Sequence, residues 1–294
     1  MSEQAERTLS PPDNSLTLSD RQFRLWADML ESRTGVIVAS DREAFFRSQI
    51  ATRVDELGFD DADAYFHDVL ATVAGMGEWS LLLDRLLIKE TRFFRHRESH
   101  EFIRDTLYQS LQEGRRDLIN LWSVGCSTGE ETYSLAINAF EAFARARVKP
   151  LFAVTGSDVS RSAVKEARDG TYTASHYPNI TEHEMVAYFR KLEGRRITVK
   201  QAVKQNVSFV INNIFEHNDG FFAGKMDYIF TQNMLIYFKR WRRKEAVNFM
   251  IEYLKPGGYL IVGPGELSDW QPSGITRVNY PGVQAYQKPP GNDQ

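Results

Sequence analysis

The chain has 294 residues, of which 42% are hydrophobic and 26% are charged, as in an ordinary folded protein with room for two modest domains. A formal net charge of −3 argues against a general nucleic-acid binder, whose phosphate contacts require a strong basic excess. The single cysteine, Cys126, excludes an intrachain disulfide and a metal site built from several cysteines, and it fits a reducing cytoplasm.

The N-terminal part of the chain is predicted to be helical after a flexible leader at residues 1–17, which shows no periodicity. The leader is polar and no apolar run reaches membrane-spanning length, so we expect a cytoplasmic protein without membrane insertion. Apolar residues recur at helical spacing through residues 18–88, which predicts an all-helical domain. Capping boxes at 19–22 and 40–43 are predicted to begin its first two helices, and Gly75 and Gly77 to precede its fourth.

The first two of these helices carry several arginines, namely Arg33, Arg42, Arg47 and Arg53. Surface charges of this kind are usually solvated and need no further role. The alternative is a docking face for an acidic helical partner. The sequence leaves both interpretations open.

From residue 89 onward, apolar runs alternate with helical patterns, which predicts a doubly wound, mostly parallel α/β sheet. Its central strand, residues 118–124, is followed by a loop of small residues between Gly125 and Gly129. Glu130 and Glu131 then begin a helix. Two carboxylates there suit a cationic, hydroxylated ligand such as S-adenosylmethionine better than a pyrophosphate. The plainer alternative is that they only stabilise the positive end of the helix.

Later strands are predicted at 151–156, 226–231 and 259–263, and a terminal hairpin at 275–287. Asp158 follows the first of them, where acidic residues of nucleotide-binding folds bind ribose hydroxyls, although it could instead cap the next helix. Residues 195–199 and 207–211 alternate like paired strands, which predicts an inserted antiparallel β-subdomain at about 190–213. Its edge suits either an added peptide strand or a simple cover for the site.

Four separated stretches resemble the CheR-type chemotaxis receptor methyltransferases: residues 91–95 (Thr-Arg-Phe-Phe-Arg), 125–131, the run that begins at Asp158, and 232–238. With residues 255–265 and the N-terminal helices, the resemblance covers nearly the whole chain. It implies a Rossmann-like S-adenosylmethionine methyltransferase domain at 89–294, an N-terminal all-helical domain at 18–88 and a small antiparallel β-subdomain. The implied reaction is glutamate O-methylation in the cytoplasmic helical region of methyl-accepting chemoreceptors, which leaves S-adenosylhomocysteine. We expect the enzyme to be a monomer.

The resemblance also implies which residues form the site. The methionine end of the cofactor would contact Thr91 and Arg95, and the glycine loop would contribute Gly125, Glu130 and Glu131. Asp158 would hold the ribose, while the adenine would be framed by Asn213, Ile214, Asn233 and Met234. Arg95 and Tyr237 are the predicted catalytic residues, Arg95 to orient a carboxylate and Tyr237 to approach the sulfur. Each has a structural alternative, because Arg95 could pair with Glu98 and Tyr237 could belong to the core.

Three features depart from the family pattern. Lys89 stands where asparagine is usual, Gln232 replaces an arginine, and Pro264 and Gly265 replace a His-Ser pair. These departures fit a divergent branch that serves a pilus-linked array instead of flagellar chemotaxis. They also keep a non-catalytic cofactor-binding adaptor as an alternative. A nucleic-acid N-methyltransferase is less consistent, because residues 232–237 lack an Asp/Asn-Pro-Pro-aromatic motif.

Other chemically suggestive residues are given structural interpretations. Cys126 has no histidine near it in sequence, so we expect a small residue fitted beside the ligand, not a nucleophile. Phe93 and Phe94 are expected to pack between the domains. No metal site is predicted, because the histidines lack paired ligand spacing and an exposed helix face explains His96 and His100.

Overall fold

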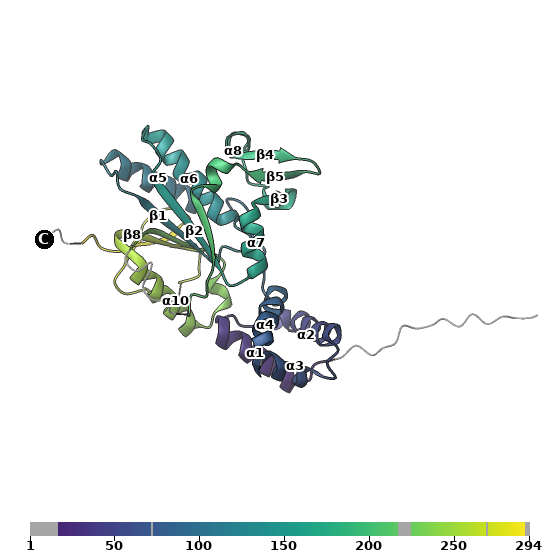
Figure 1. Cartoon of the computed structure of the whole chain (residues 1–294). Coiled ribbons are helices and arrows are strands. Elements are labelled where there is room, and N and C mark those ends of the chain that lie inside the picture. The colour runs from purple at the N-terminus through teal and green to yellow at the C-terminus, as the bar shows by residue number, and fades with distance from the viewer. Residues whose placement is uncertain (1–16, 72, 217–224, 269, 292–294) are drawn as a thin grey trace, which may run out of the picture. The chain divides into compact units, whose positions relative to one another are not determined.

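The structure, a computed structural model, describes residues 17–71, 73–216, 225–268 and 270–291 (Figure 1). It divides into two compact units. The first unit comprises the chain up to Met29 together with Val38–Leu86. The second unit comprises Leu30–Ile37 together with the chain from Leu87 onward.

The first unit is helical, as predicted. Its elements are α1 (Asp20–Thr34, whose last turn belongs to the second unit), the 3-10 turn η1 (Ser40–Arg42), α2 (Glu43–Leu57), α3 (Ala62–Ala71) and α4 (Val73–Leu86). The rings of Trp26 and Tyr65 stack in its core with centroids 5.0 Å apart. Beside them, Glu78 accepts hydrogen bonds from the Tyr65 hydroxyl and from Arg53 at 2.6 Å each, so the charge that enters this core is paired.

Two local predictions in this unit are wrong, and one is confirmed. The box at 19–22 forms, with the Ser19 amide donating to Gln22 Oε1 at 2.9 Å and the Gln22 amide donating to Ser19 Oγ at 3.3 Å. Ser40 instead starts η1, and α2 has no side-chain cap. Helix α4 begins before Gly75 and runs through it. A Cβ on Gly75 would lie 2.6 Å from the Val69 carbonyl oxygen, so this glycine permits close packing on α3 instead of breaking a helix.

The second unit is built on a mostly parallel sheet. In the described residues the order of its strands is β6-β2-β1-β7-β8-β10-β9. Strand β10 pairs antiparallel with both β8 and β9, and the other neighbouring strands pair in parallel. The strands are β1 (Ile119–Val124), β2 (Phe152–Asp158), β6 (Val207–Ile211), β7 (Met226–Thr231), β8 (Leu254–Val262), β9 (Thr276–Val278) and β10 (Gln284–Gln287). The predicted doubly wound α/β fold and its terminal hairpin are therefore confirmed.

Helices cover both faces of this sheet, and the side chains of β1 show why. Ile119 and Leu121 join one hydrophobic cluster, whereas Trp122 and Val124 join the other, because successive strand residues point to opposite faces. Figure 1 shows α5 and α6 on one side of the sheet and α10 on the other. The remaining helical elements are α5 (Arg97–Gln112), α6 (Glu130–Ala146), α7 (Arg161–Asp169), α8 (Glu182–Tyr188), α9 (Gln201–Lys204), α10 (Arg240–Tyr253), η2 (Ala174–His176) and η3 (Leu235–Tyr237).

A small antiparallel sheet is present, but its strands differ from the prediction. Its order is β3-β5-β4, from Thr171–Thr173, Arg196–Val199 and Phe189–Leu192. The predicted pairing of 195–199 with 207–211 is wrong, because β6 pairs in parallel with β2 at the edge of the main sheet. Alternation along a strand fixes which side chains share a face, but it does not identify the partner strand.

Candidate cofactor and active site

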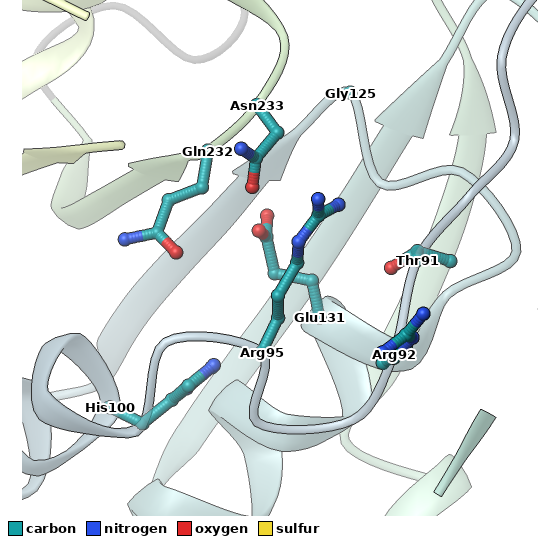
Figure 2. A pocket seen from close by; sticks show the side chains of 8 residues that line it. All are labelled: Thr91, Arg92, Arg95, His100, Gly125, Glu131, Gln232 and Asn233. Atoms are coloured by element: carbon teal, nitrogen blue, oxygen red, sulfur yellow. The ribbon is translucent and has the colours of Figure 1, made fainter. Parts of the chain in front are cut away.

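The site lies where the order of the main sheet reverses, between β1 and β7. In open α/β sheets, ligands bind outside the carboxyl ends of the strands at this switch point. A pocket is found there. Figure 2 shows its lining residues, which are Thr91, Arg92, Arg95, His100, Gly125, Glu131, Gln232 and Asn233.

The pocket gathers about half of the residues predicted for the site. Those that line it are Thr91, Arg95, Gly125, Glu131 and Asn233. Those that do not line it are Glu130, Asp158, Asn213, Ile214, Met234 and Tyr237. The sequence prediction assigned no contact role to Arg92, His100 or Gln232.

The glycine loop begins at Gly125, directly after β1. Its φ of +74° is a conformation that other residues adopt only with strain, and a Cβ there would lie 2.7 Å from the Met234 sulfur. Gly129 is the N-cap of α6 at φ +95°, and a Cβ there would lie 2.7 Å from that of Ala167 on α7. The two glycines therefore let Met234 and α7 pack directly on the loop.

The two carboxylates that begin α6 have different surroundings. Glu131 lines the pocket, and its Oε1 accepts a hydrogen bond from the Ser123 hydroxyl at 2.8 Å. Burial raises the pKa of Glu131 well above its ordinary value, while the charge of Arg95 acts in the opposite direction. Glu130 is fully buried, accepts a hydrogen bond from Thr128 Oγ1 at 2.8 Å and contacts His176 Nδ1. The Glu130 side chain is therefore bound to Thr128 and His176 and does not line the pocket.

Arg95 comes from the loop before α5. Figure 2 shows its side chain reaching toward the space between Glu131 and Asn233. Its Nη1 donates to the Glu90 carbonyl at 3.3 Å, and no ion pair joins it to Glu98 in the described part of the chain. The neighbouring Arg92 is half-exposed and pairs with the Glu90 carboxylate at 3.2 Å. The predicted Arg95–Glu98 alternative therefore does not apply.

Asp158 stands at the carboxyl end of β2 and holds the glycine loop. Its Oδ2 accepts a hydrogen bond from the Ser127 amide and its Oδ1 accepts one from the Ser160 amide, both at 2.8 Å. The side-chain N-cap of α7 is Ser160, whose Oγ accepts from the Ala163 amide, so the alternative that Asp158 caps this helix is wrong.

The predicted adenine-side residues have mainly packing roles in this structure. Asn213 Nδ2 donates to the Arg33 carbonyl at 2.6 Å, and its Oδ1 accepts from the Phe215 amide at 3.1 Å. Ile214 is buried in the same cluster as Trp122. Met234 and the half-buried Tyr237 also pack against that cluster.

Burial corrects the prediction for His100 and supports the prediction for Cys126. His100 is not on an exposed helix face: it is 2% exposed, its Nδ1 contacts Asn138 Nδ2 at 2.9 Å, and burial lowers its pKa to about 3. Its spacing with Ile103 and Leu107 places it on the apolar face of α5, a signal present in the sequence. Cys126 is buried, and burial raises its pKa, which fits a packing residue and not a nucleophile.

Phe93 and Phe94 do not pack between domains. Both are buried in the core of the second unit, where the ring of Phe93 lies 4.9 Å from that of Tyr172 and 5.1 Å from that of Phe189. The ring of Phe94 lies 5.4 Å from that of His100. These contacts fix the loop that carries Thr91 and Arg95.

The departures Gln232 and Lys89 make specific contacts. Gln232 Nε2 donates to the Ser99 hydroxyl at 2.8 Å, which ties the end of β7 to α5. Lys89 Nζ contacts the Ser162 hydroxyl, and the Lys89 carbonyl accepts from Ser127 Oγ at 3.1 Å. Both residues therefore connect the loops around the pocket.

The pocket suits a ligand that carries both charges of an amino acid. Arg95 offers a guanidinium to a carboxylate, and Glu131 offers a carboxylate to an ammonium or sulfonium. At the same wall Gly125 lets Met234 pack directly against the glycine loop. Among the described residues, no group of three or more His, Cys, Asp and Glu side chains could hold a metal ion. No helix in the described part of the chain is long and apolar enough to cross a membrane.

The fold and this pocket define a doubly wound α/β protein with a ligand site at the switch point of its sheet. Residues 89–278 match the family described as CheR methyltransferase, SAM binding domain, and residues 21–87 match its all-alpha domain. The chain therefore belongs to the CheR methyltransferase family, as the sequence motifs predicted, and S-adenosylmethionine is its cofactor. Membership in this family implies methylation in chemotaxis.

Curated relatives match most of the chain. The chemotaxis protein methyltransferases of Salmonella typhimurium and Escherichia coli are each 28% identical over 254 residues, which cover 85% of this chain and 85% and 86% of those proteins. That of Borreliella burgdorferi is 28% identical over 236 residues, or 79% of this chain and 83% of the relative.

Replacing Gly125 by alanine is expected to destabilise the protein and weaken binding of S-adenosylhomocysteine. The left-handed backbone alone costs about 1–2 kcal/mol with a side chain, and the Cβ would displace Met234. Calorimetric affinity and the melting temperature test this. Gly194→Ala is the matched control, because Gly194 has φ +69° and a Cβ added there would meet no atom within 4 Å. Equal affinity losses in the two variants would contradict the role of the Met234 contact.

The His176–Glu130 pair is expected to make stability fall with rising pH. The hydrogen bond to Glu130 raises the pKa of His176, and Glu166 acts in the same direction. Its contribution is thus complete below the ordinary histidine pKa of about 6.5 and disappears as pH rises through the raised value. We expect a loss on the order of 1 kcal/mol. Melting temperatures between pH 6 and 9 should fall less for His176→Gln, and parallel curves would contradict this assignment.

Proposed function

We propose that this protein transfers the methyl group of S-adenosylmethionine to glutamate side chains in the helical cytoplasmic region of methyl-accepting chemoreceptors. The product is a glutamyl methyl ester. The observation that supports this most is the pocket at the switch point of a CheR-family sheet, where Arg95 and Glu131 provide opposite charges. We further propose that the protein acts as a cytoplasmic monomer, with a helical domain at 18–88 and a methyltransferase domain at 89–294.

The chemistry requires alignment more than acid–base catalysis. A glutamate carboxylate, with an ordinary pKa of about 4.3, is already ionised at neutral pH and needs no general base. The cofactor supplies a methyl carbon bound to a sulfonium, so an O–C bond forms as the C–S bond breaks and its electron pair stays on sulfur. Correct placement of the reacting groups can supply about 7–11 kcal/mol of the barrier reduction at best.

The residues of the pocket have separate proposed roles in this alignment. Arg95 orients a carboxylate through its two-pronged guanidinium, and Glu131 holds a cationic group of the cofactor. Burial raises the pKa of Glu131 and so disfavours its ionised form. A positively charged group of the cofactor would stabilise the ionised carboxylate. Asp158 holds ribose hydroxyls, Thr91 and Gly125 line the methionine end and the loop, and Glu130 supports the loop. Asn213, Ile214, Asn233 and Met234 frame the adenine, and Tyr237 approaches the sulfur.

The test is transfer of labelled methyl from S-adenosylmethionine to membranes that contain the chemoreceptors of the same organism. We expect label that is released by base, as a methyl ester is, and that requires the receptor glutamates. Receptor-free membranes and receptors with those glutamates replaced by alanine are the controls. Binding of S-adenosylhomocysteine without receptor labelling would contradict the proposal and favour a non-catalytic adaptor.

A further inference from the structure

The turn from Asn233 to Tyr237, which follows β7, has a backbone that needs support. Asn233 has φ +58°, in the left-handed region that side chains rarely adopt, and it lines the pocket. The short η3 that follows has no side-chain cap. Local sequence alone therefore does not hold this wall of the pocket in place.

Glu266 binds the amide side of this turn. It is 2% exposed, its Oε1 accepts a hydrogen bond from the Ile236 amide at 3.2 Å, and its Oε2 accepts one from the Gly263 amide at 2.7 Å. Burial raises the pKa of Glu266, and the backbone amides of Gly263, Ile236, Leu235 and Asn233 act in the opposite direction. One buried carboxyl group thus joins the turn after β7 to the end of β8.

Arg243 of α10 binds the carbonyl side of the same turn. Its Nε donates to the Leu235 carbonyl at 3.1 Å and its Nη2 to the Phe238 carbonyl at 3.5 Å. Its Nη1 donates to the carbonyl of Glu266 itself at 2.9 Å. Glu266 and Arg243 therefore bind complementary backbone groups of one short segment: Glu266 accepts from amides and Arg243 donates to carbonyls.

The loop that carries Glu266 is itself fixed. A Cβ on Gly263 would lie 2.5 Å from Glu266 Oε2, so the glycine permits the approach of the carboxylate. The Gly265 amide donates to Gln284 Oε1 on β10 at 2.9 Å. Gln284 in turn donates to the Tyr286 hydroxyl at 2.9 Å. The departure at Pro264 and Gly265 is therefore anchored to the sheet.

We propose that Glu266 and Arg243 are positioning residues, which hold the Asn233–Tyr237 turn in the conformation that binds the cofactor. The inference deepens the proposed function and rests on it for the role of this turn in methyl transfer. Neither side chain lines the pocket, so each acts through the backbone of the turn. If loss of the contacts from Glu266 or Arg243 leaves about a tenth of the molecules with the turn in its binding conformation, the apparent Kd for the cofactor rises about tenfold.

The experiment compares the full-length protein with Glu266→Gln, Gly263→Ala and Arg243→Gln. Glutamine keeps the size of Glu266 but has one acceptor oxygen where the structure uses two. Gly263→Ala displaces the same carboxylate without altering it. The measurements are the Kd for S-adenosylhomocysteine by calorimetry, the hydrogen exchange of the amides of Leu235 and Ile236, and the melting temperature.

We expect all three variants to bind S-adenosylhomocysteine about tenfold more weakly, with faster exchange in the turn. Arg243→Lys, which keeps a charge but not the fork, should recover part of the affinity. The matched control is Glu184→Gln, because Glu184 is also buried and also accepts an amide hydrogen bond, from Thr181 at 2.8 Å, at the start of α8. It should lose stability without losing affinity.

Two results would overturn the inference: wild-type affinity in Glu266→Gln despite faster exchange, or an equal affinity loss in Glu184→Gln. Neither measurement involves an acceptor. A protein that binds S-adenosylhomocysteine but labels no receptor would therefore contradict the proposed function. The positioning role would still be tested by the Kd values and hydrogen exchange of the variants.

Discussion

Arg95→Ala is expected to lower the kcat/KM for methyl transfer on the order of a hundredfold. A hydrogen bond between charged groups is worth about 1.5–3 kcal/mol, and the guanidinium of Arg95 can make two of them to one carboxylate. The loss of Arg95 also removes a nearby positive charge that favours the ionised form of Glu131, which lines the same pocket. The measurement is initial-rate kinetics with labelled cofactor and receptor membranes.

The division of this loss between KM and kcat identifies which carboxylate Arg95 holds. A higher KM for S-adenosylmethionine with unchanged kcat would indicate that the guanidinium binds the cofactor equally in the ground state and the transition state. A lower kcat would indicate that it aligns the acceptor glutamate. Arg95→Lys should remain defective, because an ammonium cannot make the two-pronged contact.

A matched control separates this effect from the loss of any arginine. Arg116 donates to the carbonyls of Leu111 and Arg115, but it precedes β1 and so lies at the end of the strand remote from the pocket. Arg116→Ala should retain normal kinetics. A wild-type kcat/KM in Arg95→Ala would contradict the assignment of Arg95 to the site.

The central part of the fold could be predicted from local patterns. The apolar run before Gly125 indicated a strand covered on both faces, and the structure places its side chains in two separate clusters. The same reasoning failed for residues 195–199, whose alternation indicated a strand without specifying its partner. Pairing depends on contacts between distant parts of the chain.

The sequence prediction gave Glu130 and Glu131 the same role, whereas the structure gives their side chains different surroundings. Consecutive residues on a helix are about 100° apart, so their side chains point in different directions. Burial of Glu130 against Thr128 and His176 is the result. Helical geometry applied to the first turn of α6 would have separated their roles.

Other contacts carried no local signal at all. Asn213 binds a carbonyl oxygen 180 residues away, and Arg243 binds backbone carbonyls, which every residue has. Side chains that bind the backbone leave no complementary residue type to find in the sequence. For that reason the support of the turn after β7 became visible only in the structure.

Asp158→Ala is expected to weaken binding of S-adenosylhomocysteine on the order of a hundredfold. The carboxylate accepts the amides of Ser127 and Ser160, and a hydrogen bond to a charged acceptor is worth about 1.5–3 kcal/mol. Its loss should loosen the glycine loop and, in our proposal, remove the partner of the ribose hydroxyls. Asp158→Asn should have a smaller effect, since the amide retains one acceptor oxygen.

Calorimetry with a ligand analogue that lacks the ribose hydroxyls distinguishes these two contributions. If Asp158 holds the ribose, the wild type should bind the analogue about tenfold more weakly than S-adenosylhomocysteine, while Asp158→Ala should bind both equally. If Asp158 only supports the loop, removing the hydroxyls should cost both proteins the same affinity. The second pattern would contradict the ribose assignment, and it would make Asp158 a structural residue that shapes the loop through Ser127.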